Sequence, residues 1–98
     1  MDYKIIVNRK AVKKIEKAYL YYEGISDGLG ERFLEQLQRA FNSLSLYPTN
    51  FGFIDEKKIL RDRLLKIFPY SVIYKIDGDS VIIVTLHNCY QDPVKRYK

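Results

Sequence analysis

Two apolar runs near the end of the chain, separated by a four-residue turn segment, restrict the possible folds more than any other feature of the sequence. The first run, residues 70–76, largely alternates apolar and polar side chains with the two-residue period of a half-buried strand. The segment Asp77-Gly78-Asp79-Ser80 supplies residue types that tolerate a tight reversal. The second run, residues 81–86, is apolar almost throughout, as expected of a central strand. These features predict a β-hairpin with His87 emerging where the second strand leaves the core.

Two segments with helical periodicity precede this hairpin. Asn8 is a residue type that caps helices, and apolar side chains recur after it at helical spacing as far as Tyr22. The tripeptide at residues 26–28, Ser-Asp-Gly, breaks this helix, and a second helix is expected to run to Pro48. Its apolar stripe consists of Phe33, Leu37, Ala40, Leu44 and Tyr47. Two amphipathic helices joined by so short a link predict a helical hairpin whose stripes share one apolar surface.

Two short strands complete the predicted order of elements. Residues 3–7 and 59–67 fit strands, and the two-residue period places Arg61 and Arg63 on one face of the second. The order β-α-α-β-β-β groups the helices instead of alternating them with strands. The predicted class is therefore α+β, with a helical hairpin packed on one face of a small antiparallel sheet. No long linker, repeat or low-complexity tract interrupts the chain, so residues 1–98 are expected to form one domain.

Charge and cysteine content limit the classes of partner and site. The chain holds 17 Lys and Arg against 12 Asp and Glu, and the net charge of +5 favours an acidic partner: nucleic acid, an acidic protein segment or, as the least favoured of the three, an anionic membrane. The apolar run at residues 5–7 is too short for a signal peptide or a membrane span, so we expect a cytoplasmic protein. The single cysteine, Cys89, excludes an internal disulfide and a multi-cysteine metal site, and no cofactor motif is present.

The densest basic segment, residues 57–66, is the predicted contact for a negatively charged target. Such a cluster can hold phosphates, while neighbouring aromatic side chains stack on unpaired bases. The alternative is an ordinary solvated loop and strand face. Together with two residues of the basic tail, the predicted target-binding residues are Lys57, Lys58, Arg61, Arg63, Lys66, Lys95 and Arg96.

A ribonuclease function would require a base, an acid, and cations that offset the charge of the phosphorane. His87, the only histidine, would act as base or acid at the end of the last strand. Tyr97 would serve as an acid only if its pKa were strongly perturbed, and Arg61 would supply the cation from the neighbouring strand. These three residues form the predicted catalytic set if the chain is an enzyme. The alternative for His87 is a structural hydrogen bond.

The order of short motifs along the chain resembles the RelE/ParE superfamily of toxins from type II toxin–antitoxin systems. The resemblance covers nearly the whole chain, and its specificity lies in the ordered series. It implies the same α+β fold and an acidic antitoxin that wraps the toxin and neutralises it. The series consists of Tyr19, Tyr21, Tyr22, Leu29-Gly30, Phe33-Leu34, Leu37, Leu44, Pro48, Arg61, Leu64-Leu65, the hairpin strands and Gln91-Asp92-Pro93.

Within that superfamily the chain is more similar to the ParE-like branch. The ribosome-dependent mRNA endoribonucleases similar to RelE place catalytic arginines at the positions occupied here by Ser71 and Gln91, and neither side chain can neutralise a phosphorane. Tyr97 falls near the tyrosine that those enzymes use. The ParE-like branch commonly has Arg before Asp-Pro, where this chain has Gln91, and its characterised members bind DNA gyrase without cutting RNA.

Three functional hypotheses follow. The first is a ParE-like toxin that inhibits a cellular target, DNA gyrase, by binding, and that a cognate acidic antitoxin neutralises. The second is an mRNA endoribonuclease that acts at the ribosome with a rearranged set of His87, Arg61 and Tyr97. The third is a module that has lost its toxicity and retains antitoxin binding, which the residues at Ser71 and Gln91 would explain.

Overall fold

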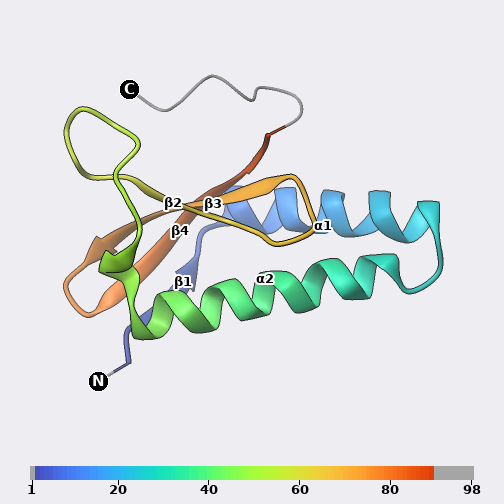
Figure 1. Cartoon of the computed structure of the whole chain (residues 1–98), viewed down its shortest axis with the longest axis horizontal. Coiled ribbons are helices and arrows are strands. Elements are labelled where there is room, and N and C mark those ends of the chain that lie inside the picture. The colour runs from blue at the N-terminus through green and yellow to red at the C-terminus, as the bar shows by residue number, and fades with distance from the viewer. Residues whose placement is uncertain (1, 90–98) are drawn as a thin grey trace.

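The computed structural model describes residues 2–89 of the chain, and its elements follow the predicted order. Strand β1 (Lys4–Val7) is followed by helices α1 (Arg9–Ile25) and α2 (Leu29–Leu46) and by the short 3-10 helix η1 (Pro48–Asn50). Strands β2 (Arg61–Leu64), β3 (Tyr70–Asp77) and β4 (Ser80–Asn88) complete the domain (Figure 1). The α+β class and the helical hairpin packed on a small sheet are confirmed.

The four strands form one sheet in the order β1-β4-β3-β2. The predicted hairpin of β3 and β4 is antiparallel, as is the pairing of β2 with β3, whereas β1 runs parallel to β4. The sheet is therefore mixed. The parallel pairing is possible because the helical hairpin carries the chain across the sheet between β1 and the later strands. A register shift between Ile73 and Tyr74 marks a bulge in the central pair.

Local hydrogen bonds explain where the two helices begin. The side chain of Asn8 accepts a bond from the backbone N–H of Ala11 at 3.0 Å, which confirms the predicted N-cap of α1. Gly28 precedes α2 with a φ of 86°, a left-handed conformation that glycine adopts without steric cost. The carboxylate of Glu23 accepts from the N–H groups of Gly28 and Gly30 at 3.0 and 2.9 Å. A side chain near the end of α1 thus satisfies free N–H groups at the start of α2.

The core lies between the helical hairpin and one face of the sheet, which we call the inner face. Four of the five residues of the predicted α2 stripe are buried, namely Phe33, Leu37, Ala40 and Leu44. They pack against inner-face side chains of the central strands, Val72, Tyr74, Val81, Ile83 and Leu86. Tyr47, predicted to continue the stripe, is 59% exposed because α2 ends at Leu46 and Pro48 begins η1.

The segment predicted as a strand at residues 59–67 is shorter in the structure, since β2 covers only Arg61–Leu64. The residues that follow form the turn between β2 and β3, in which Leu65 and Phe68 are buried and Ile67 is 74% exposed. In the part of the chain that the structure describes, no helix combines the length and the apolar composition needed to cross a membrane.

Candidate functional site

The two arginines of β2 lie on the inner face, as a pair, and both have protein partners. Arg61 donates from Nη1 to the carbonyl of Phe51 at 2.6 Å, and its guanidinium lies 3.9 Å from the centroid of the Phe53 ring. Arg63 donates from Nε to Oγ of Ser43, in α2, at 2.9 Å. Their shared face agrees with the two-residue period of the strand. Because loop carbonyls, aromatic rings and a helix hydroxyl occupy these guanidinium groups, they are less available to a phosphate.

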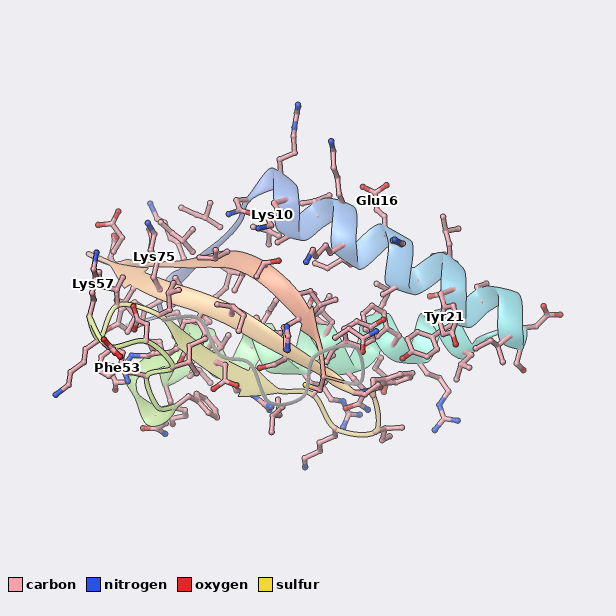
Figure 2. The ribbon with its side chains drawn as sticks, turned by 90° about the horizontal axis from the view of Figure 1, so that it is seen from above. Lys10, Glu16, Tyr21, Phe53, Lys57 and Lys75 are labelled. Atoms are coloured by element: carbon pink, nitrogen blue, oxygen red, sulfur yellow. The ribbon has the colours of Figure 1, made fainter. Side chains whose placement is uncertain are left out.

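The lysines of the predicted basic segment lie at two separate places. Lys57 and Lys58 are exposed on the loop before β2, and Figure 2 shows Lys57 directed away from the ribbon beside Phe53. Asp55 orders this loop by accepting bonds from the N–H groups of residues 59 and 60 at 2.9 and 3.0 Å. Lys66 is exposed in the turn between β2 and β3. Lys95 and Arg96 lie outside the described residues.

The predicted catalytic set is not assembled within the described part of the chain. His87 follows Leu86, a core residue of the inner face, so alternation along β4 places His87 on the opposite, outer face of the sheet. Arg61 pairs in register with Tyr74 and lies on the inner face. The sheet therefore separates these two side chains. Tyr97 lies outside the described residues.

A row of polar side chains runs across the outer face. Ser71 is fully buried and donates from Oγ to the carboxylate of Asp62 at 2.8 Å. His87 is the cross-strand partner of Ser71. Thr85 is also fully buried, and its Oγ1 has no hydrogen-bond partner among the described residues. The hydroxyl of Ser71 is thus directed to a carboxylate, which a phosphate group would not replace favourably.

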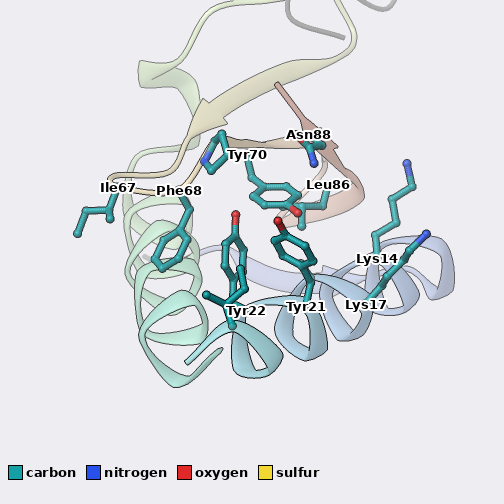
Figure 3. Close-up of a pocket in the computed structure, with 12 residues that line it drawn as sticks. Lys14, Lys17, Tyr21, Tyr22, Ile67, Phe68, Tyr70, Leu86 and Asn88 are labelled. Carbon is teal, nitrogen blue, oxygen red and sulfur yellow. The ribbon is translucent and has the colours of Figure 1, made fainter. Parts of the chain in front are cut away.

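A groove of about 730 Å³ lies between α1 and the turn that joins β2 to β3. Figure 3 shows Lys14 and Lys17 on one side, the rings of Tyr21 and Tyr22 in the middle, and Phe68 and Ile67 on the far side. The apolar rim is unusually exposed for a small domain, since Tyr21, Ile25 and Ile67 have exposed fractions of 62%, 59% and 74%. The groove is lined by Lys14, Lys17, Ala18, Tyr21, Tyr22, Ile25, Ile67, Phe68, Pro69, Tyr70, Leu86 and Asn88.

Aromatic rings and phenol hydroxyls form the floor of this groove. The ring of Tyr22 meets that of Phe68 edge to face at 4.8 Å between centroids, and Phe68 meets Phe33 in the same way at 5.5 Å. Burial raises the pKa of the Tyr70 hydroxyl, while hydrogen bonds with Tyr22 and Asn88 act in the opposite direction. The Tyr70 phenol therefore stays protonated at neutral pH. An apolar floor with a few hydroxyl groups and two flanking ammonium groups is suited to protein docking.

Sequence patterns did not single out this groove. The lysine-rich side of the first helix fits solvent exposure equally well, and Lys13 does lie exposed outside the groove. The available signal was the spacing of Lys14, Ala18, Tyr21 and Ile25 along one side of the helix. The opposite wall, formed by the turn at residues 65–69, comes from a segment whose shape depends on tertiary packing.

Comparisons with known proteins agree on the fold. A chain of the chromosomal ParDE toxin–antitoxin system from P. aeruginosa superimposes with a TM-score of 0.72 at 17% identity, covering 88% of this chain and 95% of that one. A chain of the RelBE2 toxin–antitoxin complex from Mycobacterium tuberculosis gives 0.59 at 18% identity, covering 90% and 99%. No curated protein matches in sequence. The model of the ParE toxin of type II toxin–antitoxin systems, parDE, matches residues 5–92, nearly the whole chain. By sequence and by fold, the chain belongs to the ParE toxin family.

Proposed function

We propose that this chain is a growth-inhibiting toxin that acts in the cytoplasm by binding DNA gyrase, and that a cognate acidic antitoxin holds it inactive. Membership of the ParE toxin family and a fold shared with chains of two toxin–antitoxin complexes support the toxin and its antitoxin partner. Plasmid stabilisation is the corresponding biological role. The choice of inhibition by binding depends on the arrangement of charge around the sheet, and the choice of gyrase follows from the similarity to the ParE-like branch.

The observation that carries inhibition by binding is the hydrogen bond between Ser71 and the Asp62 carboxylate on the outer face. In the mRNA endoribonucleases of the superfamily an arginine stands at the position of Ser71. Phosphoryl chemistry needs cations where negative charge develops, and a carboxylate at that place opposes it. The guanidinium groups of Arg61 and Arg63 face the other side of the sheet, where protein groups hold them. This arrangement favours a binding toxin over an RNA-cleaving enzyme.

Exposed lysines provide the proposed contact with the target. Lys57 lies at one end of the molecule beside Phe53, which is 42% exposed, whereas Tyr21 lies toward the other end (Figure 2). Lys58, the next residue, is also exposed. Cationic side chains around an apolar contact increase the rate of association with an acidic protein surface. Lys66, Lys95 and Arg96 are the further cations that we assign to target binding.

Induced expression combined with two biochemical measurements tests this proposal. Expression in a bacterial host should arrest growth, and co-expression of the cognate antitoxin should restore it. Purified protein should inhibit supercoiling by DNA gyrase, and mapping of RNA 5′ ends after induction should show no new codon-phased cuts. The variant with Lys57→Glu and Lys58→Glu should inhibit gyrase less, while the variant with Lys10→Glu and Lys13→Glu, an equal change of charge on exposed residues of α1, serves as the control. New codon-phased cuts, or full gyrase activity with the protein present, would contradict the proposal.

A further inference from the structure

We propose that Arg61 is a positioning residue: its guanidinium group holds the loop of residues 51–60 in the shape that presents Lys57 and Lys58 to the target, and the arginine does not itself contact the target. The inference rests on the proposed function, since it presumes that these lysines meet the target, and it specifies how this chain orders that contact. Three features carry it: the contacts of Arg61 at the base of the loop, the hydrogen bonds of the loop backbone, and the exposed side chains at its tip.

Arg61 contacts the chain at three points, one before the loop and two inside it. Its Nη1 atom donates to the carbonyl oxygens of Phe51 at 2.6 Å and of Thr49 at 3.4 Å. The guanidinium carbon lies 3.9 Å from the centroid of the Phe53 ring, and Phe53 also forms an antiparallel bridge with the backbone of Arg61. A guanidinium group combines a flat face for stacking with donors in one plane, whereas a lysine ammonium group is a compact charge without that plane. One side chain therefore fixes the first part of the loop against β2.

Backbone and carboxylate hydrogen bonds close the rest of the loop. The N–H of Ile54 donates to the carbonyl of Leu60 at 2.9 Å, so the outgoing and returning sides of the loop are joined directly. The carboxylate of Asp55 accepts two further bonds from N–H groups of the returning side, and its carbonyl accepts from the N–H of Lys58 at 3.3 Å. Lys58 has a φ of 57°, in the left-handed region, as a tight turn requires. The tip is thus a defined turn that stands on the base held by Arg61.

The tip of the loop presents cationic and apolar side chains together. Lys57 and Lys58 are exposed, and Ile59, the next residue, is 51% exposed. Phe53, whose ring stacks on the arginine, is 42% exposed and lies at the same end of the molecule as Lys57 (Figure 2). Two ammonium groups beside exposed apolar side chains suit an acidic protein surface, whereas a nucleic acid would leave the isoleucine without contact. A loop that is already ordered loses less conformational entropy on binding, so its anchor contributes to affinity.

Two other roles for Arg61 lead to different expectations. A guanidinium group that contacted the target directly would add its own binding free energy to that of the lysines, so the losses on replacing both would multiply. An arginine with a merely structural role would loosen the whole domain, so proteolysis would become faster at every site. A positioning residue acts through Lys57 and Lys58, so its replacement has little further effect once those lysines are truncated.

Arg61→Lys tests the inference, because lysine keeps the charge and loses the planar geometry of the guanidinium group. Arg39→Lys is the matched control, since it makes the same change on the exposed surface of α2, where Arg39 pairs with Glu35 at 3.1 Å. Each change is also made in a chain that carries Lys57→Ala and Lys58→Ala. Supercoiling by purified DNA gyrase gives the inhibitory concentration of each variant. Trypsin digestion followed by mass spectrometry gives the rate of cleavage after Lys57 and Lys58 relative to the other lysines.

We expect Arg61→Lys to raise the inhibitory concentration roughly fivefold to tenfold in the otherwise unaltered chain, and by less than about twofold when both loop lysines are alanine. Cleavage after Lys57 and Lys58 should become roughly fivefold faster while cleavage after the other lysines changes less than about twofold, and Arg39→Lys should change neither measurement.

Equal losses from Arg61→Lys in both chains would overturn the inference in favour of direct contact, and uniformly faster cleavage would overturn it in favour of a structural role. Inhibition that Arg61→Lys leaves unchanged would refute the inference alone. Full gyrase activity in the presence of the unaltered chain would instead refute the proposed function, and the inference with it.

Discussion

Replacement of Thr85 by valine is expected to stabilise the protein, because the threonine hydroxyl is buried without a partner. Thr85 is 0% exposed in β4, and its Oγ1 is the buried side-chain polar atom that lacks a hydrogen bond within residues 2–89. Across the sheet, Ile73 is its cross-strand neighbour. Valine has nearly the same shape as threonine and the same preference for strands, so the substitution changes polarity and leaves packing intact.

The expected magnitude follows from the cost of burying an unpaired hydroxyl. Data from protein variants give about 1–3 kcal/mol for a buried hydroxyl without a hydrogen bond. We therefore expect Thr85→Val to raise the free energy of unfolding by about 1 kcal/mol or more. For a domain of this length, about 1 kcal/mol corresponds to a rise of roughly 4–8 °C in melting temperature.

Two neighbouring variants make the measurement specific. Ser71→Ala removes a buried hydroxyl that does have a partner, the carboxylate of Asp62, and should lower stability by about 1–2 kcal/mol. Thr85→Ala removes a methyl group along with the hydroxyl, so it should gain less than Thr85→Val. Urea unfolding followed by circular dichroism gives all three free energies. A Thr85→Val protein less stable than the unaltered chain would refute the reasoning, since it would mean that the hydroxyl is hydrogen-bonded in solution.

Three further predictions follow from other parts of the structure. Gly30→Ala should lower the free energy of unfolding by more than about 1 kcal/mol, because a Cβ there would lie 2.9 Å from the Glu23 carboxylate and the Tyr19 ring. Gly24 has open space around it, so Gly24→Ala should raise the free energy of unfolding by about 0.5–1 kcal/mol in the same urea assay. Burial raises the pKa of Tyr74 to about 12, so the protonated phenol stabilises the fold fully below pH 10, and this contribution is lost between pH 10 and 12. The free energy of unfolding measured in urea should therefore fall across that range, and Tyr74→Phe should make the fall smaller. Lys57→Glu combined with Lys58→Glu should weaken growth arrest without changing the melting temperature by more than about 2 °C, because both side chains are exposed on a loop.

The parts of the fold that depend on local interactions were predictable from the sequence. Asn8 caps α1 by accepting a hydrogen bond from the N–H group three residues along. Gly28 adopts the left-handed backbone conformation that ends the link between the helices. The hairpin of β3 and β4 likewise depends on its short turn and on the pattern of the adjoining strands. Each of these features depends on residues close together in the chain, so the residue types and their spacing are enough to predict it.

Features that depend on distant contacts were harder to predict. Alternation along β2 placed Arg61 and Arg63 on one face, but only the packed structure identifies that face as the inner one, where Ser43 of α2 and the carbonyl of Phe51 hold the guanidinium groups. The parallel pairing of β1 with β4 has the same origin, since it depends on how the helical hairpin crosses the sheet. A two-residue period specifies relative faces, and the absolute face requires the tertiary fold.

The groove illustrates the same limit at the level of function. Its α1 wall could have been recognised from residue spacing, but its other wall depends on a left-handed conformation at Ile67 that no local pattern favours. A glycine at that position would have marked a turn in the sequence, while an isoleucine suggests a continuing strand, which is why the predicted strand extended to residue 67. The buried side chains of Leu65 and Phe68 hold this turn against the core, so tertiary packing outweighs the local preference of the isoleucine. Ile67 is therefore the residue at which the predicted strand was wrong, because the packing of the turn overrides the local preference of a β-branched side chain.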